Sequence, residues 1–132
     1  MLFDQFNLPE EVLKVIFATE QQQVVAKLLL GFMKEQGGEI NKTQMSLFAT
    51  RLHEGKLEDE PEKGLLIDKK QPLSYNKRQF YDRILTPMKS MGLVDYDLYK
   101  KTYRISDKFN KIMMRIGVMW LQEIRNVQKA PY

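Results

Sequence analysis

The side chains that most often carry catalysis are scarce in this sequence of 132 residues, which has no cysteine and a single histidine, His53. These counts exclude thiol catalysis, thiolate-bound metals and disulfides, and they disfavour a Ser-His-Asp arrangement. His53 is interpreted as a partner of a helix C-terminal dipole rather than as a metal ligand. The acidic cluster Glu58–Glu62 lacks the Asp/Asn and Gly spacing of a calcium loop. We therefore expect no enzyme, no cofactor and no metal site.

Basic side chains gather in the middle of the chain. Residues 68–111 carry 11 basic and 5 acidic residues, whereas residues 1–67 carry 7 basic and 11 acidic ones. Residues 112–132 add 3 basic residues and 1 acidic residue, so the formal net charge of +4 hides an acidic first half and a basic middle. This distribution favours one anion-facing surface, with uneven solvated charge as the alternative.

Apolar spacing predicts the helices that must position this basic segment. Helices are expected over residues 8–18, 20–36 and 42–54, with Thr19–Gln22 and Asn41–Gln44 as caps of the second and third. A very short strand is possible at Glu39–Ile40. Residues 55–73 follow neither the helical nor the strand period and are predicted to form a loop insert.

A fourth helix is predicted from a cap at Ser74 to about Met91. Its apolar face is expected to be buried, whereas Tyr75 is placed on the opposite, exposed side. Pro87 lies inside this pattern, where it removes one backbone donor, so the helix should either kink or stop and restart.

Gly92 ends that helix, and the following segments predict a hairpin and a last helix. Residues 93–98 and 102–105 read as two strands joined by a turn at 99–101, and residues 107–128 read as a long helix. The predicted class is mainly α with a small β-hairpin (α+β), in one domain spanning residues 1–132.

The stretch from Phe80 to Val94 followed by Tyr103–Ser106 resembles the end of a winged helix-turn-helix domain. In that family of DNA-binding domains, which includes prokaryotic, archaeal and viral transcription regulators, a recognition helix runs into Gly-Leu-Val, a β-hairpin wing and a strand that ends before Ser or Thr. The resemblance covers residues 20–107. Residues 8–18 and 107–128 would be flanking helices, and the insert at 55–73 departs from the short turn usual between the second and recognition helices.

The resemblance implies which side chains contact DNA. Gln79 and Arg83 would read base edges in the major groove, since their forked donors match adenine and guanine. Lys77, Arg78 and Lys89 would contact phosphates, and the hairpin residues Tyr99, Lys100, Lys101 and Arg104 would reach the backbone or the minor groove. The alternatives are i, i+4 ion pairs on a solvated helix face and lysines that only protect a hairpin edge.

The last helix carries an apolar stripe too wide for a domain of this size to bury. Its residues Phe109, Met113, Ile116, Trp120 and Ile124 are predicted to form a dimer interface. Many winged-helix regulators dimerise through terminal helices, and the resemblance therefore favours the same interpretation. The alternative is that the stripe packs on the 8–18 helix within one chain.

Together these patterns predict a cytoplasmic, dimeric transcriptional regulator that binds double-stranded DNA. No apolar run approaches the roughly 20 residues of a membrane span, and the N-terminus lacks the basic flank and apolar run of a signal peptide. The alternative function is a winged-helix module for protein–protein interaction or assembly that does not bind DNA.

Overall fold

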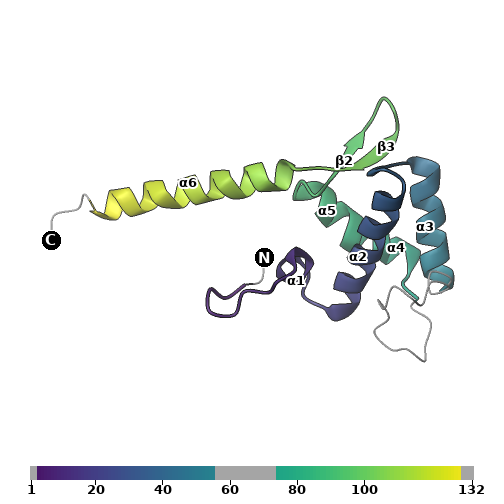
Figure 1. Ribbon diagram of the computed structural model, residues 1–132, viewed down its shortest axis with the longest axis horizontal. Coiled ribbons are helices and arrows are strands. Elements are labelled where there is room, and N and C mark those ends of the chain that lie inside the picture. Colours follow the sequence, from purple (N-terminus) through teal and green to yellow (C-terminus); the bar gives the residue numbers. More distant parts are fainter. Residues whose placement is uncertain (1–2, 56–73, 129–132) are drawn as a thin grey trace.

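The computed structural model describes residues 3–55 and 74–128 as an α-rich chain with one small antiparallel sheet (Figure 1). The helices are α1 Val12–Ile16, α2 Glu20–Glu35, α3 Lys42–Glu54, α4 Lys77–Phe80, α5 Thr86–Ser90 and α6 Lys108–Gln128, and the strands are β1 Glu39–Asn41, β2 Val94–Asp97 and β3 Thr102–Ile105. This confirms the α+β class. Apart from Gly55, the predicted insert 55–73 and its acidic cluster lie outside the described residues.

The sheet joins the segment before α3 to the hairpin. Its strand order is β1-β3-β2, with both pairings antiparallel. Tyr103 lies opposite Ile40 on one side and Tyr96 on the other, and the Tyr96 and Tyr103 ring centroids are 4.6 Å apart. Asn41 is paired with Thr102, so the beginning of α3 lies beside the hairpin turn.

The core is built from the apolar faces of α2, α3 and the fourth helical segment, closed by the sheet. Its fully buried large side chains are Val25, Leu29, Met33, Ile40, Met45, Leu52, Phe80, Ile84, Leu85, Met88 and Val94. The ring of Phe48 lies 5.5 Å from those of Phe32 and Phe80, which links the three helices. Burial of this many apolar side chains is the main favourable contribution to folding.

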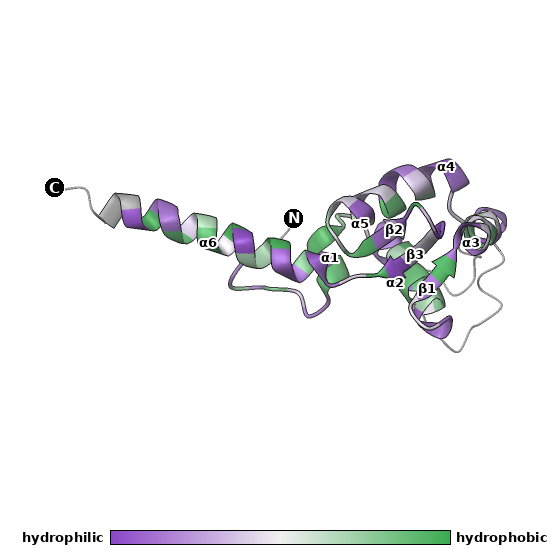
Figure 2. Cartoon of the chain, turned by 90° about the horizontal axis from the view of Figure 1, so that it is seen from above, coloured by the Kyte–Doolittle hydropathy of each residue, from purple (hydrophilic) through white to green (hydrophobic). Residues whose placement is uncertain are grey.

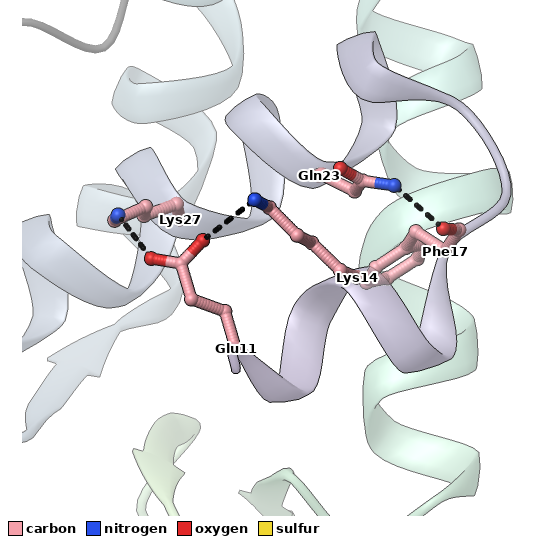
Figure 3. A network of polar contacts seen from close by, with 5 residues as sticks. All are labelled: Glu11, Lys14, Phe17, Gln23 and Lys27. Atoms are coloured by element: carbon pink, nitrogen blue, oxygen red, sulfur yellow. Dashed lines mark hydrogen bonds and ion pairs between the residues drawn. The ribbon is translucent and has the colours of Figure 1, made fainter. Parts of the chain in front are cut away.

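The first helix is shorter than the predicted 8–18, because Glu11 has an extended backbone and α1 begins only at Val12. α1 packs on α2, and two polar contacts tie the pair together (Figure 3). The Glu11 carboxylate lies 2.7 Å from the ammonium of Lys27, and Gln23 donates a hydrogen bond to the carbonyl of Phe17. The buried side of α1 therefore packs against α2.

The fourth helix begins later than predicted. Asn76, not Ser74, caps it, since the Asn76 side chain accepts hydrogen bonds from the N–H groups of Arg78 and Gln79. The Ser74 hydroxyl instead donates to the carbonyl of His53 at 2.9 Å. Tyr75, predicted to be exposed, is instead buried in the core just before the helix begins.

Pro87 does not end this helix, since helical backbone continues past it to Ser90. The five residues Tyr81–Leu85 form a π-helical turn between α4 and α5, in which the Thr86 N–H bonds to the carbonyl of Tyr81. A proline lacks the N–H that a regular α-helix would supply to the carbonyl four residues earlier. The wider turn accommodates this loss while the backbone stays helical from α4 to α5.

α6 leaves the body of the domain as a single projecting helix (Figure 1). Its first turn is anchored at Gly92, whose carbonyl accepts a hydrogen bond from the Phe109 N–H at 3.0 Å. Gly92 has φ +82°, and a Cβ there would lie 2.8 Å from the Phe109 nitrogen, so only glycine fits. Residues 114–123 are all exposed, and Figure 2 shows hydrophobic residues along the projecting part.

Candidate nucleic-acid interface

An open groove lies between the first half of α3 and the hairpin turn. Its volume is about 730 Å³, and it is lined by Asn41, Lys42, Thr43, Ser46, Leu47, Thr50, Lys100 and Lys101. Three ammonium groups, three hydroxyls and an amide therefore share this groove, together with one leucine. Such donors are suited to an anion with several oxygen atoms.

The N-terminal cap of α3 fixes one wall of the groove. The Gln44 N–H donates to the Asn41 side chain at 2.7 Å, and the Asn41 N–H donates to the Gln44 side chain at 2.8 Å. This reciprocal capping box is the one that the sequence predicted. The Lys42 N–H donates to the carbonyl of Lys101 at 3.0 Å, which joins this wall to the turn.

The hairpin turn forms the other wall, and Asp97 organises it. Its carboxylate accepts hydrogen bonds from the N–H groups of Tyr99 and Lys100 at 2.9 and 3.1 Å. These two donors, with smaller contributions from nearby cations, lower the pKa of the Asp97 carboxyl below its usual range. Lys101 adopts a left-handed backbone with φ 55°, and the Tyr99 side chain is 99% exposed. The turn thus presents both lysines and the tyrosine ring outward.

Lys77 joins the fourth helix to the same face of α3. Its ammonium donates to the hydroxyls of Thr50 at 3.1 Å and Ser46 at 3.5 Å, two residues that line the groove. Its backbone N–H donates to Nδ1 of His53 at 3.1 Å. His53 lies in the last turn of α3, where the dipole role was predicted, and it also bridges α3 to the start of α4. Lys77 is thus a fourth lysine at the edge of the groove, next to Ser46 and Thr50.

Tyr81 adds a further hydroxyl at the α3 junction. Burial raises the pKa of the Tyr81 hydroxyl, and a hydrogen bond with Ser46 opposes that effect. Ser46 thus receives contacts from two side chains one helical turn apart, Lys77 and Tyr81.

The predicted base-reading residues are exposed, but the π-helical turn changes their arrangement. Gln79 precedes the turn and Arg83 lies inside it, so the regular spacing of one α-helical turn does not apply between them. Arg78 lies 3.9 Å from Asp82, which is the i, i+4 ion pair foreseen as the alternative for this residue. Both side chains of that pair are strongly exposed, so the pair is weak.

The two remaining predicted contacts have partners within the chain. The Lys89 ammonium lies over the rings of Tyr96 and Tyr103, at 5.8 and 6.0 Å from their centroids. The Arg104 guanidinium lies 3.7 Å from Asp95, which also binds Lys108 at 2.9 Å. The hydrogen bond from Lys108 is the main cause that lowers the pKa of the Asp95 carboxyl.

Sequence reasoning missed Lys42, Ser46 and Thr50, the polar face of α3. They are spaced by four residues, so they stand in one row on the helix, beside the face that buries Met45, Phe48 and Leu52. That spacing is the signal that would have identified them. Their link to Lys100 and Lys101 depends on the sheet, which the sequence indicated only as a hairpin and a possible short strand.

No family model, no curated protein and no solved structure matches this chain, so its function is inferred from its own residues. Within residues 3–55 and 74–128, no group of three or more His, Asp or Glu side chains is arranged to hold a metal ion. In the same part of the chain, no helix combines the length and the apolar character needed to cross a membrane.

Proposed function

We propose that this chain is a cytoplasmic winged helix-turn-helix regulator that binds double-stranded DNA as a homodimer. The order of its elements supports the winged-helix part of this proposal. A helix, a short strand, two helical segments and a hairpin follow one another, and the first strand pairs with the second strand of the hairpin. In this proposal the segment Lys77–Ser90 is the recognition helix and the β2–β3 turn is the wing.

The groove between α3 and the hairpin turn carries the proposal. It brings Lys42, Lys100 and Lys101 together with hydroxyl donors, and Lys77 contacts two of those hydroxyls. The described residues that line the groove include no carboxylate. A backbone phosphate of DNA matches this set, since lysines and hydroxyls are among the common partners of its oxygen atoms.

The other residues take roles that follow from their exposure and partners. Gln79 and Arg83, exposed on and after α4, would read base edges. Arg78 would exchange its weak pair with Asp82 for a phosphate. Lys89 and Arg104 are held by aromatic rings and by Asp95, so we expect them to contribute less than the groove lysines.

The dimer part of the proposal rests on α6. Phe109, predicted to lie in the interface, packs against the core of its own domain. Met113 and Ile124 are half-buried, and Ile116 and Trp120 are 49% and 65% exposed. A projecting apolar stripe of this length is costly to leave in water, and pairing with the α6 of a second chain would cover it. The two recognition helices would then enter successive major grooves, about 34 Å apart.

A salt titration on random duplex DNA tests DNA binding. Affinity should fall steeply as salt rises, because bound lysines release counterions from phosphates. Binding that is undetectable at low salt would contradict the proposal and favour the protein-interaction module, the candidate that the exposed stripe of α6 supports. If DNA binding is detected, selection of bound duplexes from a random pool should reveal a repeated half-site for a dimer.

Two kinds of substitution separate base reading from phosphate contact. Gln79→Ala or Arg83→Ala should reduce discrimination at one base position by about 1–3 kcal/mol, whereas Lys100→Ala should weaken all sequences alike. An equal loss on every sequence for all three variants would argue against base reading.

Trp120→Glu should give a monomer in sedimentation, and an unchanged mass would refute the α6 dimer.

A further inference from the structure

α6 has a second apolar face that one helix pairing leaves uncovered. Met114, Val118 and Leu121 are spaced by four and three residues, so they stand together on the side of the helix away from Phe109 and Ile116. They are 71%, 51% and 53% exposed. A partner α6 seated on the first stripe would not reach this second face, which therefore needs another occupant.

The start of the chain carries the other extended group of exposed apolar side chains. Phe3, Phe6, Leu8 and Val12 are all exposed, Phe6 to 83%. Elsewhere in the described residues, the large exposed hydrophobic side chains outside α6 are Leu47, Leu98 and Tyr99. The segment 3–12 and α6 project from the same side of the domain body (Figures 1 and 2). Within one chain the segment does not cover the second face, since residues 114–123 are exposed.

The charges of these two surfaces are opposite. Residues 3–12 contain Asp4, Glu10 and Glu11 and no basic residue, a net charge of −3. Glu11 already pairs with Lys27 of its own chain, so Asp4 and Glu10 are the carboxylates that would face the partner. α6 contains four basic residues and one glutamate, a net charge of +3. Lys111 lies three residues before Met114 and Arg125 four residues after Leu121, so a basic residue flanks each end of the second face. This complementarity favours a second copy of the chain as the partner.

We infer that, in the dimer, the N-terminal segment 3–12 of each chain packs on the Met114–Val118–Leu121 face of the partner's α6. The exchange would cover the apolar surface of both elements and pair the acidic segment with a basic helix. It would also give the α6 pair contacts to both domain bodies. The inference rests on the proposed dimer, and it is independent of DNA binding.

Because the sequence has no cysteine, cysteines introduced for a cross-linking test would be its only thiols. Leu8→Cys and Val118→Cys are prepared as separate full-length proteins, mixed in equal amounts and oxidised mildly. We expect the mixed Leu8–Val118 disulfide to form several-fold more than with the control pair, Leu8→Cys and Glu123→Cys. Glu123 is exposed on the same helix, but five residues further on, so it points in a different direction.

The possible results separate the inference from the proposed dimer. If the protein sediments as a dimer and the mixed disulfide is no more frequent than in the control pair, the inference is wrong and the dimer stands. A monomer in sedimentation refutes both. A chain carrying both Leu8→Cys and Val118→Cys gives a further check: a disulfide formed within single chains at high dilution would overturn the exchange between partners.

Discussion

Replacing two groove lysines tests whether the groove holds DNA phosphates. Lys42→Ala and Lys100→Ala are combined because each removes an exposed cation from one wall of the groove. Lys101 is retained because its backbone, at φ 55°, is part of the turn. Each phosphate contact contributes about 0.9 to the slope of log affinity against log salt, so the slope should become shallower by about 2 per chain and about 4 per dimer.

The measurement is a fluorescence titration of duplex DNA at several salt concentrations. The matched control is Lys14→Ala with Lys34→Ala, which removes the same charge from the separate groove between α1 and α2. If only overall charge mattered, the two double variants would behave alike. Equal slopes for the groove variant, the control and the wild type, with unchanged circular dichroism, would refute phosphate binding in this groove.

Three further predictions concern the stability of the fold. Gly92→Ala should lower the free energy of unfolding by about 1–3 kcal/mol in urea titrations, since φ is +82° and the new Cβ would meet the Phe109 nitrogen; Gly31→Ala, which meets nothing within 4 Å, should not destabilise. Asn41→Ala removes the α3 cap and should cost about 1 kcal/mol in the same assay. The lowered pKa of Asp97 means that its ionised form stabilises the fold above the unfolded pKa, and this stabilisation disappears as the pH falls through the folded pKa. Asp97→Asn should therefore lower the melting temperature at neutral pH and have little effect at strongly acid pH.

The elements with strong local signals were predictable from the sequence. α3 has the predicted bounds and its capping box, and α2 begins at the predicted Thr19 cap. β3 has its predicted bounds, and β2 differs from its prediction by one residue at each end. These elements follow from short-range chemistry, namely caps, apolar period and turn residues, so they need no knowledge of the rest of the fold.

The errors have three causes: a contact distant in sequence, a helix that begins later than its apolar period, and a π-helical turn. Ser74 looked like a cap, but it donates to His53, 21 residues earlier, and leaves the cap to Asn76. Tyr75 was assigned to the exposed side by extending the helical period to a residue that lies outside the helix. The π-helical turn before Pro87 has no counterpart in a period of 3.6 residues, so the spacing of Gln79 and Arg83 could not be read correctly.

The candidate groove was only half visible in the sequence. Lys100 and Lys101 stood out as a charged hairpin turn, whereas Ser46 and Thr50 resemble any solvated helix face. What brings them together is the pairing of Asn41 with Thr102, which sets the beginning of α3 against the turn. Strand pairing between residues as far apart as Asn41 and Thr102 is a tertiary property, and a pattern in either segment alone cannot reveal it.

The junction between α3 and α4 links the groove to the helix proposed to read bases. The Lys77 ammonium contacts Thr50, and its backbone N–H contacts His53, so one residue of α4 is held at two positions along α3. Both contacts involve the helix whose other end carries Lys42 in the groove. A phosphate bound by Lys42 would therefore fix the position of α3, and through Lys77 the position of Gln79 two residues further on. Positioning of a recognition helix by backbone contacts requires this kind of rigid connection.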